Sequence, residues 1–177
     1  MSHAATEAAS EAEAQADTAT AASVTIGKPA AELRSLWLEP DTQSRIWSHF
    51  ATVRAVDDCT ADWSVPGLTG GDYRWRTVTA QEAPDRLRWS TQDGADLPNI
   101  GVLAFRPAPG DRGTELHLEV RFDPPGGAIG QALAKLFRIA PHEIVRTALY
   151  RFRALALTGE IPTTDPQPAA RHDGTGR

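Results

Sequence analysis

A strict alternation of apolar and polar residues near the end of the chain constrains the fold most. Between residues 115 and 122, apolar and polar side chains take turns: Leu116, Leu118, Val120 and Phe122 against Glu115, His117, Glu119 and Arg121. Successive side chains of a β-strand point to opposite faces, so this segment predicts a strand with one buried and one solvated face. Such half-buried strands are typical of antiparallel sheets.

Shorter stretches with the same period precede this strand, separated by turns rich in Gly, Pro and Asp. They predict strands over residues 23–28, 52–56, 61–65, 73–79, 87–91 and 101–105. The turns from residue 52 onward are short, so these strands are expected to form a meander. The result is an antiparallel sheet of about seven strands.

Two short helices are predicted between the first and second strands. Pro29 suits the first turn of a helix, Pro40 ends that helix, and Asp41 can cap the next one. The apolar faces of the two helices carry Leu33, Leu36 and Trp37, and then Ile46, Trp47 and Phe50.

A long helical region follows the last strand, divided by Pro141. Beyond Pro141 an apolar stripe indicates a fixed helix that Gly159 terminates: Val145, Ala148, Leu149, Phe152, Leu155 and Ala156. Before it, the helix over residues 128–139 carries Phe137 on its apolar face and is hinged at Gly126-Gly127. We expect this front segment to be a lid over a cavity or a part of the core, in preference to a membrane contact through Lys135 and Arg138.

The ends of the chain differ from its middle. Residues 1–22 are mostly Ala, Glu, Ser, Thr, Gln and Asp, and residues 163–177 contain Pro, Gly and Asp without periodicity. We interpret these as a disordered arm and a disordered tail. One α+β domain over residues 23–162 remains, and the whole chain has 41% hydrophobic and 23% charged residues, as ordinary globular proteins do.

Charge and hydropathy exclude several classes of protein. The net charge is -5, with an acidic arm and no basic stripe, which argues against nucleic-acid binding. No apolar run approaches the roughly 20 residues that span a bilayer, and no signal peptide is visible, so we expect a cytoplasmic protein without stable membrane insertion. Arg greatly outnumbers Lys, which fits a GC-rich bacterial genome. The oligomeric state stays open.

Motifs for cofactors and metals are missing from the sequence. It contains no phosphate-binding Gly-Lys-Ser/Thr loop, no dinucleotide fingerprint and no nucleophile elbow. The five histidines have no helical metal-ligand spacing, and Cys59 is the sole cysteine. We therefore expect neither a metal nor a cofactor.

Several phrases of the sequence carry a family resemblance. They are residues 29–37, His49 with Val53, residues 98–101 (Pro-Asn-Ile-Gly), 112–115 (Arg-Gly-Thr-Glu), 122–127 (Phe-Asp-Pro-Pro-Gly-Gly) and 157–162 (Leu-Thr-Gly-Glu-Ile-Pro). Together they resemble bacterial polyketide cyclase/dehydrase-type proteins of the START-like (SRPBCC, helix-grip) superfamily. The resemblance implies a curved antiparallel sheet around a long C-terminal helix, with a cavity for a hydrophobic ligand.

Two positions depart from the pattern of that family. Gln43-Ser44 stands where the family often has Leu-Pro, and Arg76 stands where an acidic residue is common. The first change affects the second short helix, which borders the mouth of the expected cavity. The second adds a cation on or near the central strands.

Aromatic and apolar side chains are the candidate ligand-binding residues, because a sheet that grips a helix can leave an apolar space between them. The predicted set is Trp37, Trp47, Trp63, Trp75, Thr77, Trp89, Leu103, Phe105, Leu118, Phe137, Leu149 and Phe152. Plain core packing is the alternative for each tryptophan. Thr77, with its neighbour Thr79, is a candidate hydrogen-bond partner of a ligand, and a bond within the sheet or a rim position is the alternative.

His49 and Tyr73 are the candidate acid–base residues, since an imidazole at a cavity mouth can titrate near neutral pH. The alternative for His49 is a cap of the helix C-terminus. The leading hypothesis is binding of a small hydrophobic molecule such as a polyketide, lipid or quinone. The alternatives are a polyketide cyclase or dehydratase that uses the same cavity, and a lipid or quinone chaperone working with a membrane or partner enzyme.

Overall fold

Seven β-strands and three α-helices make up the part of the chain that the computed structural model describes, residues 19–67, 70–123 and 140–162. The strands are β1 (Ala19–Ile26), β2 (Thr52–Ala55), β3 (Thr60–Pro66), β4 (Asp72–Ala83), β5 (Arg86–Thr91), β6 (Asn99–Pro107) and β7 (Thr114–Phe122). The helices are α2 (Ala30–Leu38), α3 (Pro40–Trp47) and α5 (Pro141–Thr158), with a 3-10 turn, η1 (Pro109–Asp111), before β7.

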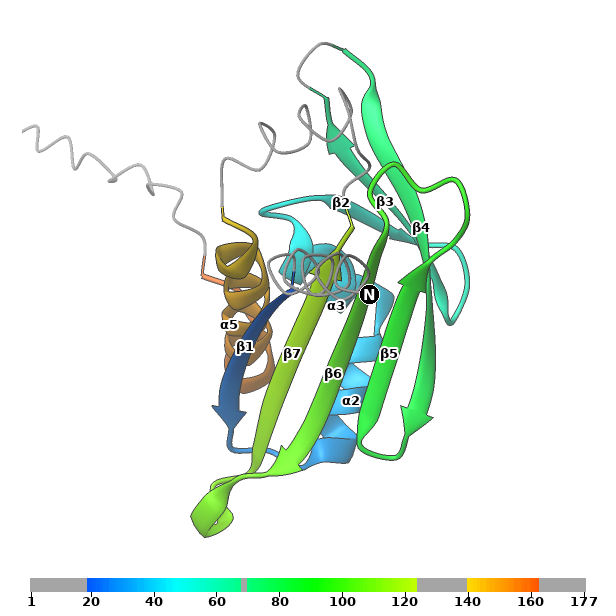
Figure 1. Cartoon of the computed structure of the whole chain (residues 1–177). Coiled ribbons are helices and arrows are strands. Elements are labelled where there is room, and N and C mark those ends of the chain that lie inside the picture. The colour runs from blue at the N-terminus through cyan, green and yellow to red at the C-terminus, as the bar shows by residue number, and fades with distance from the viewer. Residues whose placement is uncertain (1–18, 68–69, 124–139, 163–177) are drawn as a thin grey trace, which may run out of the picture.

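All strands belong to one antiparallel sheet that curls around the helices (Figure 1). Its order is β1-β7-β6-β5-β4-β3-β2, so β2 to β7 form a meander and β1 pairs with the last strand. α5 packs mainly against β1, with further contacts to β7, α3 and α2. This arrangement confirms the predicted α+β class and fits a helix-grip fold.

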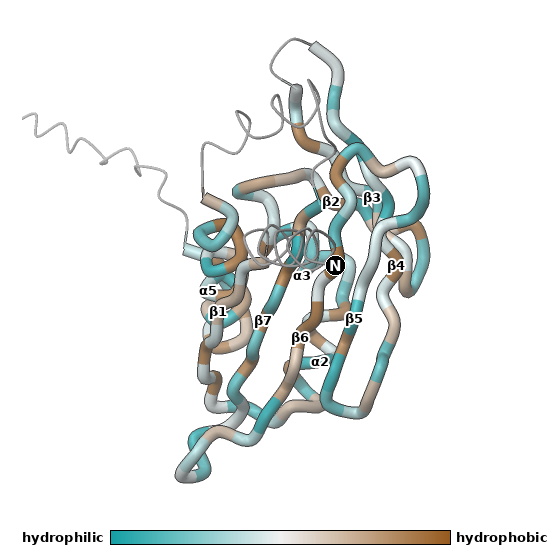
Figure 2. Tube along the Cα trace, in the orientation of Figure 1, coloured by the Kyte–Doolittle hydropathy of each residue, from teal (hydrophilic) through white to brown (hydrophobic). Residues whose placement is uncertain are grey.

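The core forms where α5 meets the inner face of β1 and β7 and where α2 meets β6. The predicted stripe on α5 is buried, and Val145, Leu149 and Phe152 have no exposed surface. Apolar and polar residues alternate along β7 (Figure 2), and its residues Leu116 and Leu118 are fully buried. Burial of a side chain of this size contributes about 1.5–3 kcal/mol, so each of these residues stabilises the fold substantially.

The ends of the helices follow from proline and glycine. α5 begins at Pro141 and ends before Gly159, whose φ of 75° lies in the left-handed region that glycine favours, as predicted. The predicted cap at Asp41 is wrong by two residues. Glu39 is the N-cap of α3 and Pro40 is its first residue, because a proline at that position loses no helical hydrogen bond.

β1 begins at Ala19, before the predicted Ser23, because β7 is long enough to pair with it from Ala19 opposite Arg121 to Ile26 opposite Thr114. The rest of the predicted arm, the predicted tail and the predicted helix over residues 128–139 with Phe137 lie outside the described residues. No helix in the described ranges is long and apolar enough to cross a bilayer.

Candidate functional site

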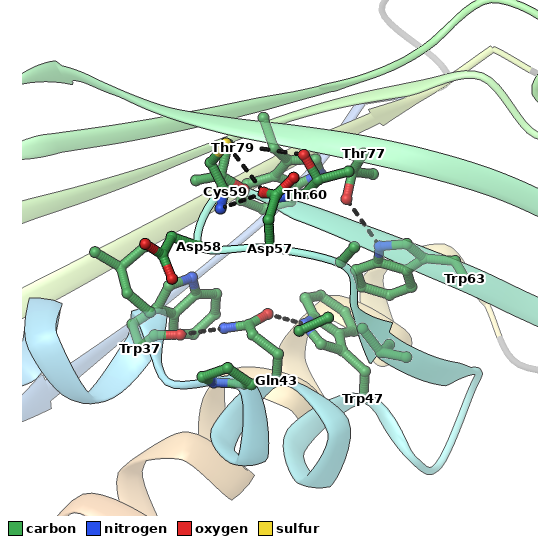
Figure 3. A pocket seen from close by; sticks show the side chains of 16 residues that line it. Trp37, Gln43, Trp47, Asp57, Asp58, Cys59, Thr60, Trp63, Thr77 and Thr79 are labelled. Carbon is green, nitrogen blue, oxygen red and sulfur yellow. Dashed lines mark hydrogen bonds between the residues drawn. The ribbon is translucent and has the colours of Figure 1, made fainter.

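A pocket lies between the α2–α3 corner and the inner face of β2, β3 and β4 (Figure 3). Sixteen residues line it: Trp37, Leu38, Pro40, Gln43, Trp47, Val53, Ala55, Asp57, Asp58, Cys59, Thr60, Ala61, Trp63, Thr77, Thr79 and Trp89. Its free space is about 60 Å³. Sites that enclose drug-sized ligands measure roughly 300–1,000 Å³, so a large ligand would need the α2–α3 corner or the β2–β3 turn to move.

Tryptophan rings form two sides of the pocket. Trp63 lies edge-on to Trp47, with ring centroids 5.5 Å apart, and stacks at 5.9 Å on Trp75, its cross-strand partner. Trp37 packs edge-on against Phe152 of α5, with centroids 5.0 Å apart. These spacings are those at which aromatic pairs attract each other, so the rings are held in place by their neighbours and by the core.

Gln43 joins the two helices at the base of the pocket (Figure 3). Its side-chain oxygen accepts a hydrogen bond from Trp47 Nε1 at 3.1 Å, and its Nε2 donates to the carbonyl oxygen of Trp37. Because Gln43 and Trp47 are one helical turn apart, they share a face of α3. The departure from the family pattern at Gln43 thus places a hydrogen-bonded amide in the lining.

Thr77 fixes the orientation of Trp63. Trp63 Nε1 donates to Thr77 Oγ1 at 2.9 Å, across the strand pair β3–β4. Thr77 is 3% exposed and lines the pocket, and the structure gives its hydroxyl no second partner among the described residues. The hydroxyl therefore keeps one hydrogen that a ligand oxygen or nitrogen can accept.

Trp89 forms the deep wall of the pocket, and two residues of β6, Asn99 and Gly101, determine how its indole lies. Trp89 Nε1 donates to Asn99 Oδ1 at 3.2 Å, and Asn99 Nδ2 donates to the carbonyl oxygen of Leu97 at 2.9 Å. Gly101 is directly opposite Trp89 in the register, and a Cβ there would lie 1.9 Å from the indole ring. The missing side chain at Gly101 is what lets the indole lie against the sheet.

The β2–β3 turn closes the mouth. Asp57 Oδ1 accepts hydrogen bonds from the backbone N–H groups of Cys59 (2.9 Å) and Thr60 (2.8 Å). These bonds, that from Cys59 above all, lower the pKa of Asp57, so its carboxylate stays ionised. Asp58 is exposed beside it and has no hydrogen bond or ion pair with any described residue.

Of the predicted ligand-binding residues, the structure brings Trp37, Trp47, Trp63, Thr77 and Trp89 together around this pocket. Trp75 stacks behind Trp63 and borders a separate groove on the outer face of the sheet. The remaining described members of that set lie in the filled core and not at the pocket: Leu103, Phe105, Leu118, Leu149 and Phe152.

His49 does not line the pocket but joins α3 to α5. Its Nδ1 lies 3.0 Å from the carbonyl oxygen of Ile46 and its Nε2 3.1 Å from that of Ile144, so it caps α3 and holds the start of α5. Burial lowers the pKa of His49 more than these two bonds raise it. From the other helix, Arg151 donates to the carbonyl oxygen of Arg45 at 2.8 Å and to Ser48 Oγ at 2.6 Å.

Tyr73 and Arg76 also lie outside the pocket lining. Tyr73 is half-buried on the inner face, opposite Val65. Arg76 points outward and makes a two-pronged ion pair with Asp62, at 2.6 and 2.9 Å. The hydrogen bond from Arg76 lowers the pKa of Asp62. The arginine that departs from the family pattern therefore forms an ion pair on the outer surface of the sheet. The acid–base roles of His49 and Tyr73 stay predictions.

Sequence reasoning did not select Gln43, Asp57, Asp58 or Thr60 as site residues. The spacing of Gln43 and Trp47 gave a usable signal, since polar and aromatic side chains one turn apart meet on a helix. The β2–β3 turn gave no such signal, because its position across the pocket from the α2–α3 corner (Figure 3) depends on contacts distant in sequence. No group of three or more potential metal ligands occurs in the described residues.

Solved structures resemble this chain over most of its length. DR_A0006 from Deinococcus radiodurans is similar with a TM-score of 0.62 and 30% sequence identity, over 80% of this chain and 98% of that one. TTHA0849 from Thermus thermophilus is similar with a TM-score of 0.63 and 18% sequence identity, over 80% of this chain and 98% of that one.

A third similar structure is that of the di-domain ARO/CYC StfQ from the steffimycin biosynthetic pathway, with a TM-score of 0.56 and 14% identity. The match covers 85% of this chain and 55% of StfQ, and at this identity it shows a shared fold alone. No protein-family model and no curated protein matches the sequence.

Proposed function

This chain belongs to the family of the Deinococcus radiodurans protein DR_A0006, and we propose that its function is to bind a small, planar hydrophobic molecule. The site is the pocket between the α2–α3 corner and β2, β3 and β4. The observation that carries the proposal is its lining of four tryptophans, Trp37, Trp47, Trp63 and Trp89, around free space.

The energetics of such a site are modest. A ligand of about eleven non-hydrogen atoms, the size of a methylated naphthalene, would gain about 4–6 kcal/mol, which is a Kd between about 1 and 0.05 mM. Flat rings suit the narrow space between indoles, and the free hydrogen of the Thr77 hydroxyl supports one hydrogen bond to an acceptor on the ligand. Even a bicyclic ring exceeds the free space of about 60 Å³, so its binding requires the α2–α3 corner or the β2–β3 turn to open, and a larger polyketide, lipid or quinone requires a wider opening.

The proposal is tested by equilibrium dialysis of the protein against 1-methylnaphthalene, with Ala55→Trp as the blocking variant. Ala55 lines the mouth and is exposed, so an indole there fills the pocket without disturbing the core. Ala80→Trp is the matched control, because Ala80 is also exposed but lies on the outer face of β4. We expect Ala55→Trp to abolish binding and Ala80→Trp to leave it unchanged.

Absence of binding up to the solubility limit, or equal binding to both variants, would contradict the proposal. Native mass spectrometry of protein purified without denaturation complements this test. A small molecule that stays bound to the original protein and is lost from Ala55→Trp would give the class of the ligand.

Cyclase or dehydratase activity on a ligand in the same pocket is the second candidate. The observation that favours it is the convergence of carboxylates and hydroxyls on one apolar space: Asp57, Asp58, Thr60, Thr77 and Thr79. A carboxylate could take a proton from an acidic carbon while a hydroxyl binds the carbonyl that is attacked. The likeness to StfQ agrees with this at the level of fold.

Incubation with linear poly-β-ketone analogues tests this candidate, with loss of water on ring closure followed by mass spectrometry. We expect Asp58→Asn to slow ring closure while leaving 1-methylnaphthalene bound. Equal rates with and without the protein would leave binding as the function.

A further inference from the structure

The pocket is negative at its mouth and aromatic inside, and this combination selects the charge of the ligand. Both charged residues among its lining are acidic, Asp57 and Asp58, and no Lys, Arg or His is among the lining residues that the structure describes. Glu39, which is exposed, is a third carboxylate next to the lining residues Leu38 and Pro40 in the chain.

Of the cations nearest in the sequence to this rim, Arg45 and Arg76 are paired with other carboxylates, and Arg54 lies exposed on the outer face of β2, where it borders the outer groove. Arg45 lies 3.5 Å from Asp41 within α3. Arg76 lies on the outer face and is bound to Asp62 through two nitrogens. Asp58, in contrast, has no partner among the described residues, so its charge remains available at the mouth.

The hydrogen-bond donors of the indoles are mostly used inside the protein. Trp47 donates to Gln43, Trp63 to Thr77 and Trp89 to Asn99. Three of the four indole N–H groups that border the pocket are therefore not free to bind an anionic oxygen. What the indoles still offer a ligand is their π-systems, which attract cations more strongly than those of any other side chain.

We propose that the pocket selects a planar organic cation, such as an N-alkylated or protonated heteroaromatic ring, over neutral and anionic molecules of the same shape. The ring lies among the indoles and the positive nitrogen faces Asp58. Free carboxylates and free fatty acids are rejected, because the lining offers them two like charges and no cationic side chain. This inference rests on the proposed binding function and adds the charge of the ligand to it.

Three probes of nearly the same shape separate the inference from the function on which it rests. They are N-methylquinolinium, its neutral isostere 1-methylnaphthalene, and the anion 1-naphthoate. Equilibrium dialysis at low ionic strength measures the Kd of each. We expect the cation to bind about three- to tenfold more tightly than the neutral isostere, since an exposed cation–π contact and a nearby carboxylate each contribute severalfold. The anion should bind most weakly.

Asp58→Asn removes the free charge without removing a hydrogen bond. It should weaken binding of the cation severalfold and leave the Kd of the neutral probe unchanged, while the part of the preference that comes from the indole π-systems remains. Asp93→Asn is the matched control, because Asp93 is an exposed carboxylate of the groove on the outer face. The preference should also shrink in about 0.5 M salt, where charges are screened within a few ångströms.

Each outcome bears on one of the two claims. If the neutral probe binds as tightly as the cation, or if Asp58→Asn leaves the preference intact, the charge selection is overturned and the binding function stands. If none of the three probes binds, the binding function fails, and the inference fails with it.

Discussion

The two ends of the curled sheet face their helices in different ways. Beside β1 and β7, α5 packs aliphatic and phenyl groups against the sheet, and Leu149 and Phe152 have no exposed surface. Beside β2, β3 and β4, the α2–α3 corner leaves free space among indoles that are oriented by hydrogen bonds. Apolar packing is non-directional and can fill a space completely, whereas hydrogen-bonded indoles have fixed positions and can leave a gap between them.

The comparison assigns stability to one region and recognition to the other. Trp37 connects them, since its ring packs on Phe152 and also lines the pocket. Substitutions in the filled region should therefore change the free energy of unfolding, and substitutions in the pocket should change binding at a smaller loss of stability.

The largest expected effect comes from Phe152→Ala in the filled region. Removal of a fully buried phenyl ring should lower the free energy of unfolding by about 3–5 kcal/mol, measured by urea denaturation. Leu157→Ala on the same helix is the control, because Leu157 is 48% exposed and should cost little. A loss below about 1 kcal/mol for Phe152→Ala would show that α5 is not tightly gripped.

Gly101→Ala should have the next largest effect. It should lower the free energy of unfolding by about 2–3 kcal/mol, because the new Cβ overlaps the indole of Trp89 and must push it out. The same substitution in a Trp89→Ala background should cost less than about 1 kcal/mol, since the obstacle is gone. Equal losses in both backgrounds would contradict the close approach of the ring to the sheet. The ligand affinity of Gly101→Ala should fall as well, because Trp89 is a wall of the pocket.

Thr77→Val should lower the free energy of unfolding by about 1–2 kcal/mol, because it leaves the N–H of Trp63 without an acceptor in a half-buried site. In a Trp63→Phe background the same change should be nearly neutral, because no donor is left unpaired. The double-mutant cycle measures this difference directly. Additive effects would show that the hydrogen bond does not orient the indole.

The smallest effect concerns the junction of α3 and α5. Burial lowers the pKa of His49 in the folded state, so on acidification through its ordinary pKa of about 6.5 the unfolded chain takes up the proton first. Stability should therefore be full above this pH and decline by a few tenths of a kcal/mol, and at most about 1 kcal/mol, as the pH falls to about 5.

His49→Gln should remove this part of the pH dependence while keeping one hydrogen bond between the helices. Thermal unfolding on either side of the ordinary histidine pKa, at about pH 5 and about pH 7.5, measures it. His142→Gln is the control, since His142 is 62% exposed at the start of α5. Identical pH profiles for the original protein and His49→Gln would exclude His49 as the titrating group.

Much of the fold was predictable from the sequence because its signals are local. The alternation from Glu115 to Phe122 and the stripe from Val145 to Ala156 each report which face of an element is buried. The candidate site was predictable only in part. Five of the described candidates line the pocket, whereas Leu103 and Leu149, with the same apolar character, lie in the filled core. Residue type alone cannot distinguish a residue that lines a pocket from one that packs in the core, since both are apolar and both are buried.

The sequence by itself determined the helix-grip architecture, through the periods of its strands and its last helix and the Gly, Pro and Asp residues between them. Tertiary structure alone decided that Gln43 meets Trp37, that Thr77 accepts from Trp63, and that the Asp57–Asp58 turn lies at the mouth. These contacts join residues of different elements, and their geometry depends on how the sheet curls. The charge and size of what the pocket accepts are therefore properties of the folded chain.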